Sequence, residues 1–80
     1  MRMSSKIKEL EEMKEIITIA IAREQASMRY YTEAFLKAIT ENTQRLFSLL
    51  IEQEKAHEAK LRAQLHEIQS EIEFEQMKSK

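Results

Sequence analysis

Apolar residues recur through the first half of the chain at steps of three and four residues, with one step of seven. They are Ile7, Leu10, Met13, Ile17, Ile21, Met28, Tyr31, Phe35 and Ala38. Such spacing places these side chains on one face of a helix. The pattern therefore predicts one long amphipathic helix over about residues 5–39.

The only interior cluster of residues that favour turns and helix caps is Thr40-Glu41-Asn42-Thr43. Asn42 or Thr43 could cap a following helix, because its side-chain oxygen can accept a hydrogen bond from a free backbone N–H of the first turn. We therefore expect the chain to reverse direction over residues 40–43.

A second apolar stripe follows this turn. It consists of Phe47, Leu50, Leu61, Leu65, Ile68 and Ile72. The stripe predicts a second helix over about residues 44–76, and the short turn makes the two helices antiparallel. The expected fold class is all-α, with residues 1–80 forming a single two-helix hairpin.

A hairpin of this kind cannot bury both of its apolar stripes by itself. Helices of roughly 35 residues are about 50 Å long at a rise of about 1.5 Å per residue, so two of them form a rod. Chains this small usually need an added source of stability such as oligomerisation. We therefore expect a homo-oligomer, at least a dimer, in which two hairpins form a four-helix bundle.

The composition agrees with long helices and excludes several classes of function. The chain has no glycine, proline or cysteine, so it lacks the usual turn residues and cannot form disulfides, thiolate zinc sites or iron–sulfur clusters. All 14 acidic residues are glutamates, which suit helix interiors. The 13 basic residues are spread among them and leave a net charge of -1, so nucleic acid is not an expected partner.

No segment of the sequence predicts a membrane association. The longest apolar run covers residues 16–22 and is interrupted by Thr18, whereas a membrane-spanning helix needs roughly 20 apolar residues. The first ten residues also lack the apolar segment of a signal peptide. We therefore expect a cytoplasmic protein.

Three polar residues occupy positions on the apolar faces where apolar side chains are expected. Glu24 lies on the apolar face of the first helix, and Glu54 and His57 lie between Leu50 and Leu61 on that of the second. A carboxylate that faces the interior must keep its charge in a poor solvent or take up a proton, and either outcome is costly. These three residues are therefore candidates for a shared site.

A two-fold dimer would place four carboxylates and two imidazoles near the axis of the bundle. Four glutamate charges would balance two divalent metal ions. One Glu from each of two helices and Glu-x-x-His from each of the other two is a known di-iron or di-manganese pattern. Oxygen ligands with imidazole and no thiolate favour iron, with manganese possible, over structural zinc. The sequence therefore predicts a site of Glu24, Glu54 and His57 with two iron ions per dimer.

The remaining candidates have simpler interpretations. A Glu-x-x-His motif alone is weak evidence, and it gains weight here from its place on the apolar face. Tyr31 is either a core residue or a hydrogen-bonding neighbour of the metal ligands. Tyr30 is expected at an interface, His66 in solvent, and Met13 and Met28 in the core. No catalytic residue separate from the metal ligands is expected.

The segments around the candidate ligands resemble the rubrerythrin and ferritin-like superfamily. The likeness lies in the run from Ile17 to Tyr31, which contains Arg-Glu24-Gln, and the run from Leu46 to Leu61, which contains Glu54-Lys-Ala-His57. The single hairpin is similar in plan to encapsulated ferritins, which build a di-iron ferroxidase site across a dimer. The resemblance implies iron oxidation by O₂ or peroxide, and a possible larger ring inside a protein compartment.

The chain also departs from these relatives. Arg23 and Ala26 stand where encapsulated ferritins tend to carry additional glutamates near the metal entry, and no apolar targeting peptide follows Met77. Without cysteine there is no rubredoxin-like module, so peroxide reduction would need an external electron donor. Two alternatives to a ferroxidase stay open. One is an iron-binding or metal-binding protein without turnover, and the other is a metal-free helical oligomerisation module.

Overall fold

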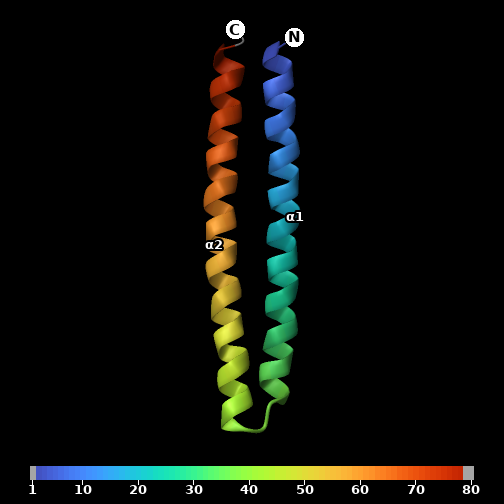
Figure 1. The fold of residues 1–80 in the computed structure, drawn as a ribbon, viewed down its shortest axis with the longest axis vertical. Coiled ribbons are helices and arrows are strands. Elements are labelled where there is room, and N and C mark those ends of the chain that lie inside the picture. The colour runs from blue at the N-terminus through green and yellow to red at the C-terminus, as the bar shows by residue number, and fades with distance from the viewer. Residues whose placement is uncertain (1, 79–80) are drawn as a thin grey trace.

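The protein is a hairpin of two long antiparallel helices, seen in a computed structural model that describes residues 2–78. Helix α1 covers Arg2–Lys37 and helix α2 covers Glu41–Lys78 (Figure 1). The Cα atoms extend over 61 × 14 × 11 Å, and the start of α1 and the end of α2 lie at the same end of the rod, away from the turn. This arrangement confirms the expected all-α hairpin. Neither helix, over the residues described, contains a stretch apolar enough to cross a membrane.

The turn is shorter and earlier than the sequence indicated. It consists of residues 38–40, because α2 begins at Glu41 and not near residue 44. Thr40 caps α2, since its Oγ1 accepts a hydrogen bond from the Thr43 backbone N–H at 3.1 Å. The expectation that Asn42 or Thr43 would be the cap is therefore wrong. Gln44 supports the turn by donating from Nε2 to the Ala38 carbonyl oxygen at 3.1 Å.

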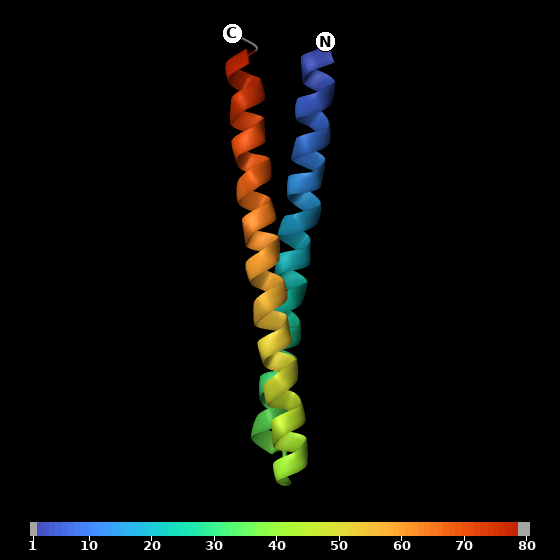
Figure 2. The same ribbon diagram turned by 60° about the vertical axis from the view of Figure 1, so that its left-hand side comes forward.

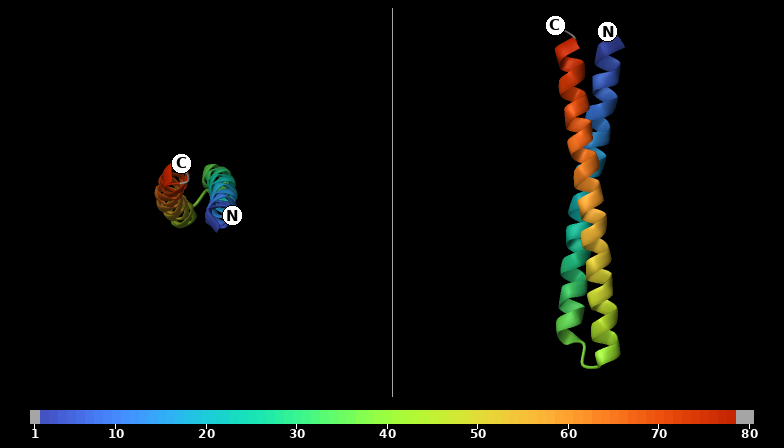
Figure 3. Two further views of the ribbon diagram at one scale, coloured as in Figure 1. Left: turned by 90° about the horizontal axis from the view of Figure 1, so that it is seen from above. Right: turned by 90° about the vertical axis from the view of Figure 1, so that its left-hand side faces the viewer.

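The two helices meet along a seam that repeats every seven residues. From α1 the seam contains residues 7, 10, 14, 17, 21, 24, 28, 31 and 35, and from α2 residues 47, 51, 54, 58, 61, 65, 68, 72 and 75. A strict seven-residue repeat makes helices wind around one another, and the helices cross gradually in the turned views (Figures 2 and 3). Ile21 and Ile72, each 6% exposed, are the only buried apolar side chains among those described. One hairpin alone therefore has almost no closed core.

The two sides of this seam differ in character. On one side, the polar flank, the seven-residue register places only polar side chains: Glu11, Thr18, Gln25 and Thr32 from α1, and Ser48, Lys55, Arg62, Gln69 and Gln76 from α2. Glu11, Gln69 and Gln76 line one groove there, which shows that these positions of both helices lie on the same side.

The opposite side, the mixed flank, carries small and apolar residues beside the middle of the seam and polar residues toward the end away from the turn. In α1 the register places Lys6, Met13, Ala20, Ser27 and Ala34 there, and in α2 Leu50, His57, Gln64 and Glu71. Met13 is therefore exposed on this flank of the single hairpin, and its expected place in the core of a four-helix bundle stays a prediction. Ile16, Tyr30, Leu46 and Phe74 lie further out on the same side and are exposed as well. Small residues in such a row allow a second helix to approach closely.

One buried carboxylate near the open end of the hairpin is well neutralised. Glu75 is 3% exposed, and the ammonium groups of Lys6 from α1 and Lys78 from α2 lie 3.1 and 3.5 Å from its Oε2. The hydrogen bond and charge of Lys6 outweigh the effect of burial and hold the pKa of Glu75 below its ordinary value. The chain thus pairs this buried glutamate with lysines from both helices.

The lowered pKa of Glu75 predicts a pH-dependent contribution to stability. A carboxyl group with a lower pKa in the folded state stabilises the protein above the unfolded-state pKa, near 4.5, and this contribution is lost as the pH falls through the folded-state pKa. The variant Glu75→Gln should therefore unfold more easily than the native chain at pH 7, and the gap should narrow below pH 4.5. Urea unfolding at several pH values measures this, with the exposed Glu71→Gln as control. A gap that is the same at pH 7 and pH 3 would contradict the assignment.

Candidate metal centre

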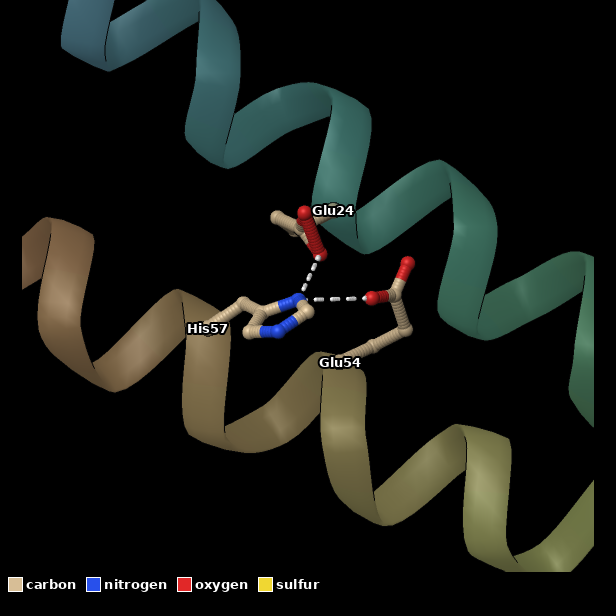
Figure 4. Close-up of side chains that lie close together, drawn as sticks. All are labelled: Glu24, Glu54 and His57. Atoms are coloured by element: carbon tan, nitrogen blue, oxygen red, sulfur yellow. Dashed lines mark hydrogen bonds and ion pairs between the residues drawn. The ribbon is translucent and has the colours of Figure 1, made fainter.

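The fold brings the three predicted ligands together near the middle of the rod. Glu24 comes from α1, and Glu54 and His57 come from successive turns of α2 (Figure 4). One possible ligand atom from each lies within 4.8 Å of the others. With the turn centred on residue 39, Glu24 is 15 residues before it and Glu54 is 15 residues after it. The two carboxylates therefore lie at the same height along the rod.

The imidazole of His57 connects the two carboxylates. Its Nδ1 lies 3.0 Å from Glu54 Oε1, within hydrogen-bond distance, and 3.6 Å from Glu24 Oε2. The other ring nitrogen, Nε2, lies on the far side of the ring from these contacts (Figure 4). The Glu24 and Glu54 side chains are 22% and 15% exposed, whereas His57 is 55% exposed on the mixed flank. The two carboxylates are thus mostly buried in the seam, whereas the imidazole is exposed to solvent on the mixed flank.

The charge of these carboxylates is poorly compensated. Among the described residues no lysine or arginine forms an ion pair with Glu24 or Glu54, and Glu24 Oε2 is buried without a hydrogen-bond partner. Burial raises the pKa of Glu24, the adjacent Glu54 carboxyl adds to the rise, and His57 opposes it. The contrast with Glu75, which has two lysines nearby, shows that the cluster lacks a cation.

A divalent metal ion fits this set of groups. Two carboxylates and one imidazole, with no thiolate, are donors that iron and manganese accept. The buried oxygen of Glu24 that lacks a partner would gain one in the metal. Three protein ligands from one hairpin leave further positions on the ion free, and the cluster is open on the flank where a second chain could supply them.

The other candidate residues lie outside this cluster. Tyr31 stacks on Phe47 with ring centroids 6.4 Å apart and meets the edge of Tyr30 at 5.7 Å. No hydrogen bond of Tyr31 to the cluster is found among the described residues, so its role beside the ligands stays a prediction. Tyr30 is exposed on the mixed flank, and His66 is exposed away from the cluster.

Sequence reasoning missed a second polar group at the same level of the seam. Gln25 donates from Nε2 to Glu58 Oε2 at 3.3 Å, and Arg62 pairs with the same oxygen at 2.6 Å. The available signal was the position of Glu58 on the seam, four residues after Glu54. It was hard to distinguish from the many exposed glutamates of α2.

A helical hairpin with a carboxylate and histidine cluster between its helices is the unit from which ferritin-like bundles are built. The chain matches the family model for rubrerythrin over residues 2–79. It therefore belongs to the rubrerythrin family, within the ferritin-like superfamily. Domains of this type generally bind iron and have a di-iron carboxylate fold. Searches of curated proteins and of solved structures give no significant match.

The raised pKa of Glu24 predicts that the cluster destabilises the metal-free protein. A carboxyl group with a higher pKa in the folded state loses its stabilising contribution as the pH rises through that pKa, so at pH 7 its charge opposes folding. The isosteric Glu24→Gln should therefore raise the unfolding free energy of the metal-free protein, by about 1 kcal/mol, because it removes a buried charge that the Glu54 carboxylate repels.

Denaturant unfolding in EDTA at pH 7 and one fixed chain concentration tests this prediction. The exposed Glu15→Gln in the same helix is the control and should change little. A Glu24→Gln variant that is less stable than the native chain in EDTA would show that the carboxylate is satisfied without metal.

Proposed function

We propose that the protein is a di-iron carboxylate ferroxidase, which oxidises Fe(II) with O₂ or peroxide at a site shared between two chains. The observation that carries the proposal is the cluster of Glu24, Glu54 and His57, in which a buried oxygen of Glu24 has no hydrogen-bond partner. Membership in the rubrerythrin family supports iron as the metal. Two copies of the cluster would supply four carboxylates, whose charge matches that of two divalent ions.

The surface around the cluster supports pairing through the mixed flank. His57 opens onto this flank, and the row of Ala20, Ser27 and Ala34 beside it leaves space for a helix of the second chain. Burying the exposed Ile16 and Leu46 there would add apolar area that one hairpin leaves in water. The positions that immediately border the seam on the polar flank are all polar.

The off-centre position of the cluster fits an antiparallel pair. From Glu24, helix α1 runs about 20 Å to its end at the turn and about 33 Å to its other end, at about 1.5 Å per residue. A two-fold axis at the cluster would therefore lay the long arm of each hairpin along the short arm of its partner. The last roughly 13 Å of each open end would project beyond the partner. Glu75 lies in this projecting part, where Lys6 and Lys78 of its own chain already neutralise it.

The side chains of the cluster would bind and orient the metal ions. Glu24 and Glu54 supply negative charge that favours divalent ions and tolerates the rise to Fe(III). His57 would bind through Nδ1, which already faces both carboxylates. Bound iron would supply the redox chemistry that these side chains lack. Oxidation of two Fe(II) releases two electrons, which together with two protons reduce O₂ to H₂O₂ or H₂O₂ to two H₂O.

Substitution of one ligand tests whether the cluster binds and oxidises iron. The native protein should contain about one iron per chain, and Fe(II) added in air should be consumed together with O₂ or peroxide. Glu54→Ala should lose most of its iron and lower the oxidation rate at least tenfold. Even the loss of a residue that only hydrogen-bonds to a metal ligand typically lowers metal affinity or activity by about tenfold or more. Glu52→Ala, an exposed glutamate two residues away that pairs with Lys55, is the matched control. If the native protein binds iron but consumes neither O₂ nor peroxide, the ferroxidase proposal is wrong and the protein binds metal without turnover.

Disruption of the mixed flank tests whether the site is shared. Ala34→Glu places a charge on this flank, ten residues from Glu24, and leaves every ligand intact. It should halve the native mass in sedimentation and remove the iron at the same time. Thr32→Glu, on the polar flank two residues earlier, should leave mass and iron content unchanged. A monomeric Ala34→Glu protein that keeps about one iron per chain would show that one hairpin suffices.

A further inference from the structure

A polar network joins the two helices directly behind the candidate metal centre. Gln25 of α1 donates from Nε2 to Glu58 Oε2 of α2 at 3.3 Å. Arg62, one turn further along α2, donates to the same oxygen from Nε at 2.7 Å, and its Nη2 forms an ion pair with that oxygen at 2.6 Å. One carboxylate oxygen thus accepts hydrogen bonds from Gln25 and Arg62, and Gln25 is the donor that comes from the other helix.

This network lies level with the ligands but on the polar flank. Gln25 follows Glu24 in α1, and Glu58 follows His57 in α2. Each partner of the interhelical hydrogen bond is therefore the immediate neighbour of a ligand. A change in the helix separation at Gln25 and Glu58 would shift Glu24 and His57 by a similar distance.

The charges at this level of the seam show why Glu58 is not itself expected to bind metal. Glu58 is 16% exposed, comparable to Glu54, but its charge is neutralised by Arg62. Glu24 and Glu54 have no such partner among the described residues. Arg62 thus neutralises the Glu58 carboxylate, whereas the carboxylates of Glu24 and Glu54 stay available to a metal cation.

The helices need a restraint at this level. The carboxylates of Glu24 and Glu54, whose negative charge has little nearby positive charge, face each other in the seam and repel. Apolar packing offers little to oppose this, since the nearest buried apolar residue is Ile21 of α1. Metal ligands must be held to within roughly 0.5 Å of the productive geometry by the residues around them. A hydrogen bond from Gln25 to a fixed carboxylate opposes the separation of the helices without entering the site.

We propose that Gln25, Glu58 and Arg62 are positioning residues that set the distance between α1 and α2 at the metal centre. Arg62 fixes the Glu58 carboxylate, and Gln25 ties α1 to it. This proposal rests on the proposed function, because it assumes that Glu24, Glu54 and His57 bind metal.

Titration with Co(II), monitored by its visible absorption band, tests this proposal on the full chain. Gln25→Ala and Glu58→Ala should bind Co(II) about tenfold more weakly, with the native stoichiometry and a changed band, as outer-shell losses typically do. Glu58→Gln should bind within about threefold of the native chain, because its amide oxygen still accepts from Gln25 and Arg62. Gln69→Ala, on the same polar flank, is the control and should match the native protein.

The outcomes separate this proposal from the proposed function. If Gln25→Ala and Glu58→Ala match the native protein in affinity and band, the positioning role is wrong while the metal site stands. If they are only less stable to urea and keep the native band, the network is merely structural and the proposal also fails. A Glu58→Gln variant as weak as Glu58→Ala would overturn it too, since charge and not the hydrogen bond would then matter. A native protein that binds neither Co(II) nor Fe(II) would overturn the proposed function itself.

Discussion

The structure depends on two carboxylates that are held in a helix seam with too little positive charge. Glu24 and Glu54 lie level with each other because the turn is centred on residue 39, and among the described residues only His57 is a basic group that contacts both. Elsewhere the same chain neutralises buried glutamates thoroughly, with lysines at Glu75 and with Arg62 at Glu58. We therefore propose that a metal cation offsets this electrostatic cost at the exception, the cluster of Glu24, Glu54 and His57.

The lack of a buried core in a single hairpin is the reason why we propose a second chain. A two-helix rod encloses almost no core, and its polar flank can face water without cost. The mixed flank carries exposed Ile16 and Leu46 beside a row of small residues. The cluster of Glu24, Glu54 and His57 opens onto this flank, so we propose that one interface both buries these apolar side chains and completes the metal site.

Periodicity predicted most of this fold and the three candidate ligands. Glu24, Glu54 and His57 were identifiable because polar side chains on an apolar face are rare. The turn was misplaced because Thr40, Asn42 and Thr43 are all cap formers, and only the hydrogen bond to Thr40 Oγ1 distinguishes them. The contact of Gln25 with Glu58 could not be predicted from the sequence, because a polar pair at the edge of a seam has the same sequence pattern as two solvated side chains.

The metal site shared between two chains is tested most directly by diffraction from iron-loaded crystals at the iron absorption edge. We predict two anomalous peaks between two antiparallel hairpins. Each peak should lie within bonding distance of Glu24, Glu54 and His57 and have ligands from both chains. Peaks held by one chain alone, peaks elsewhere on the rod, or carboxylates that face solvent across an interface formed by the polar flank would contradict it.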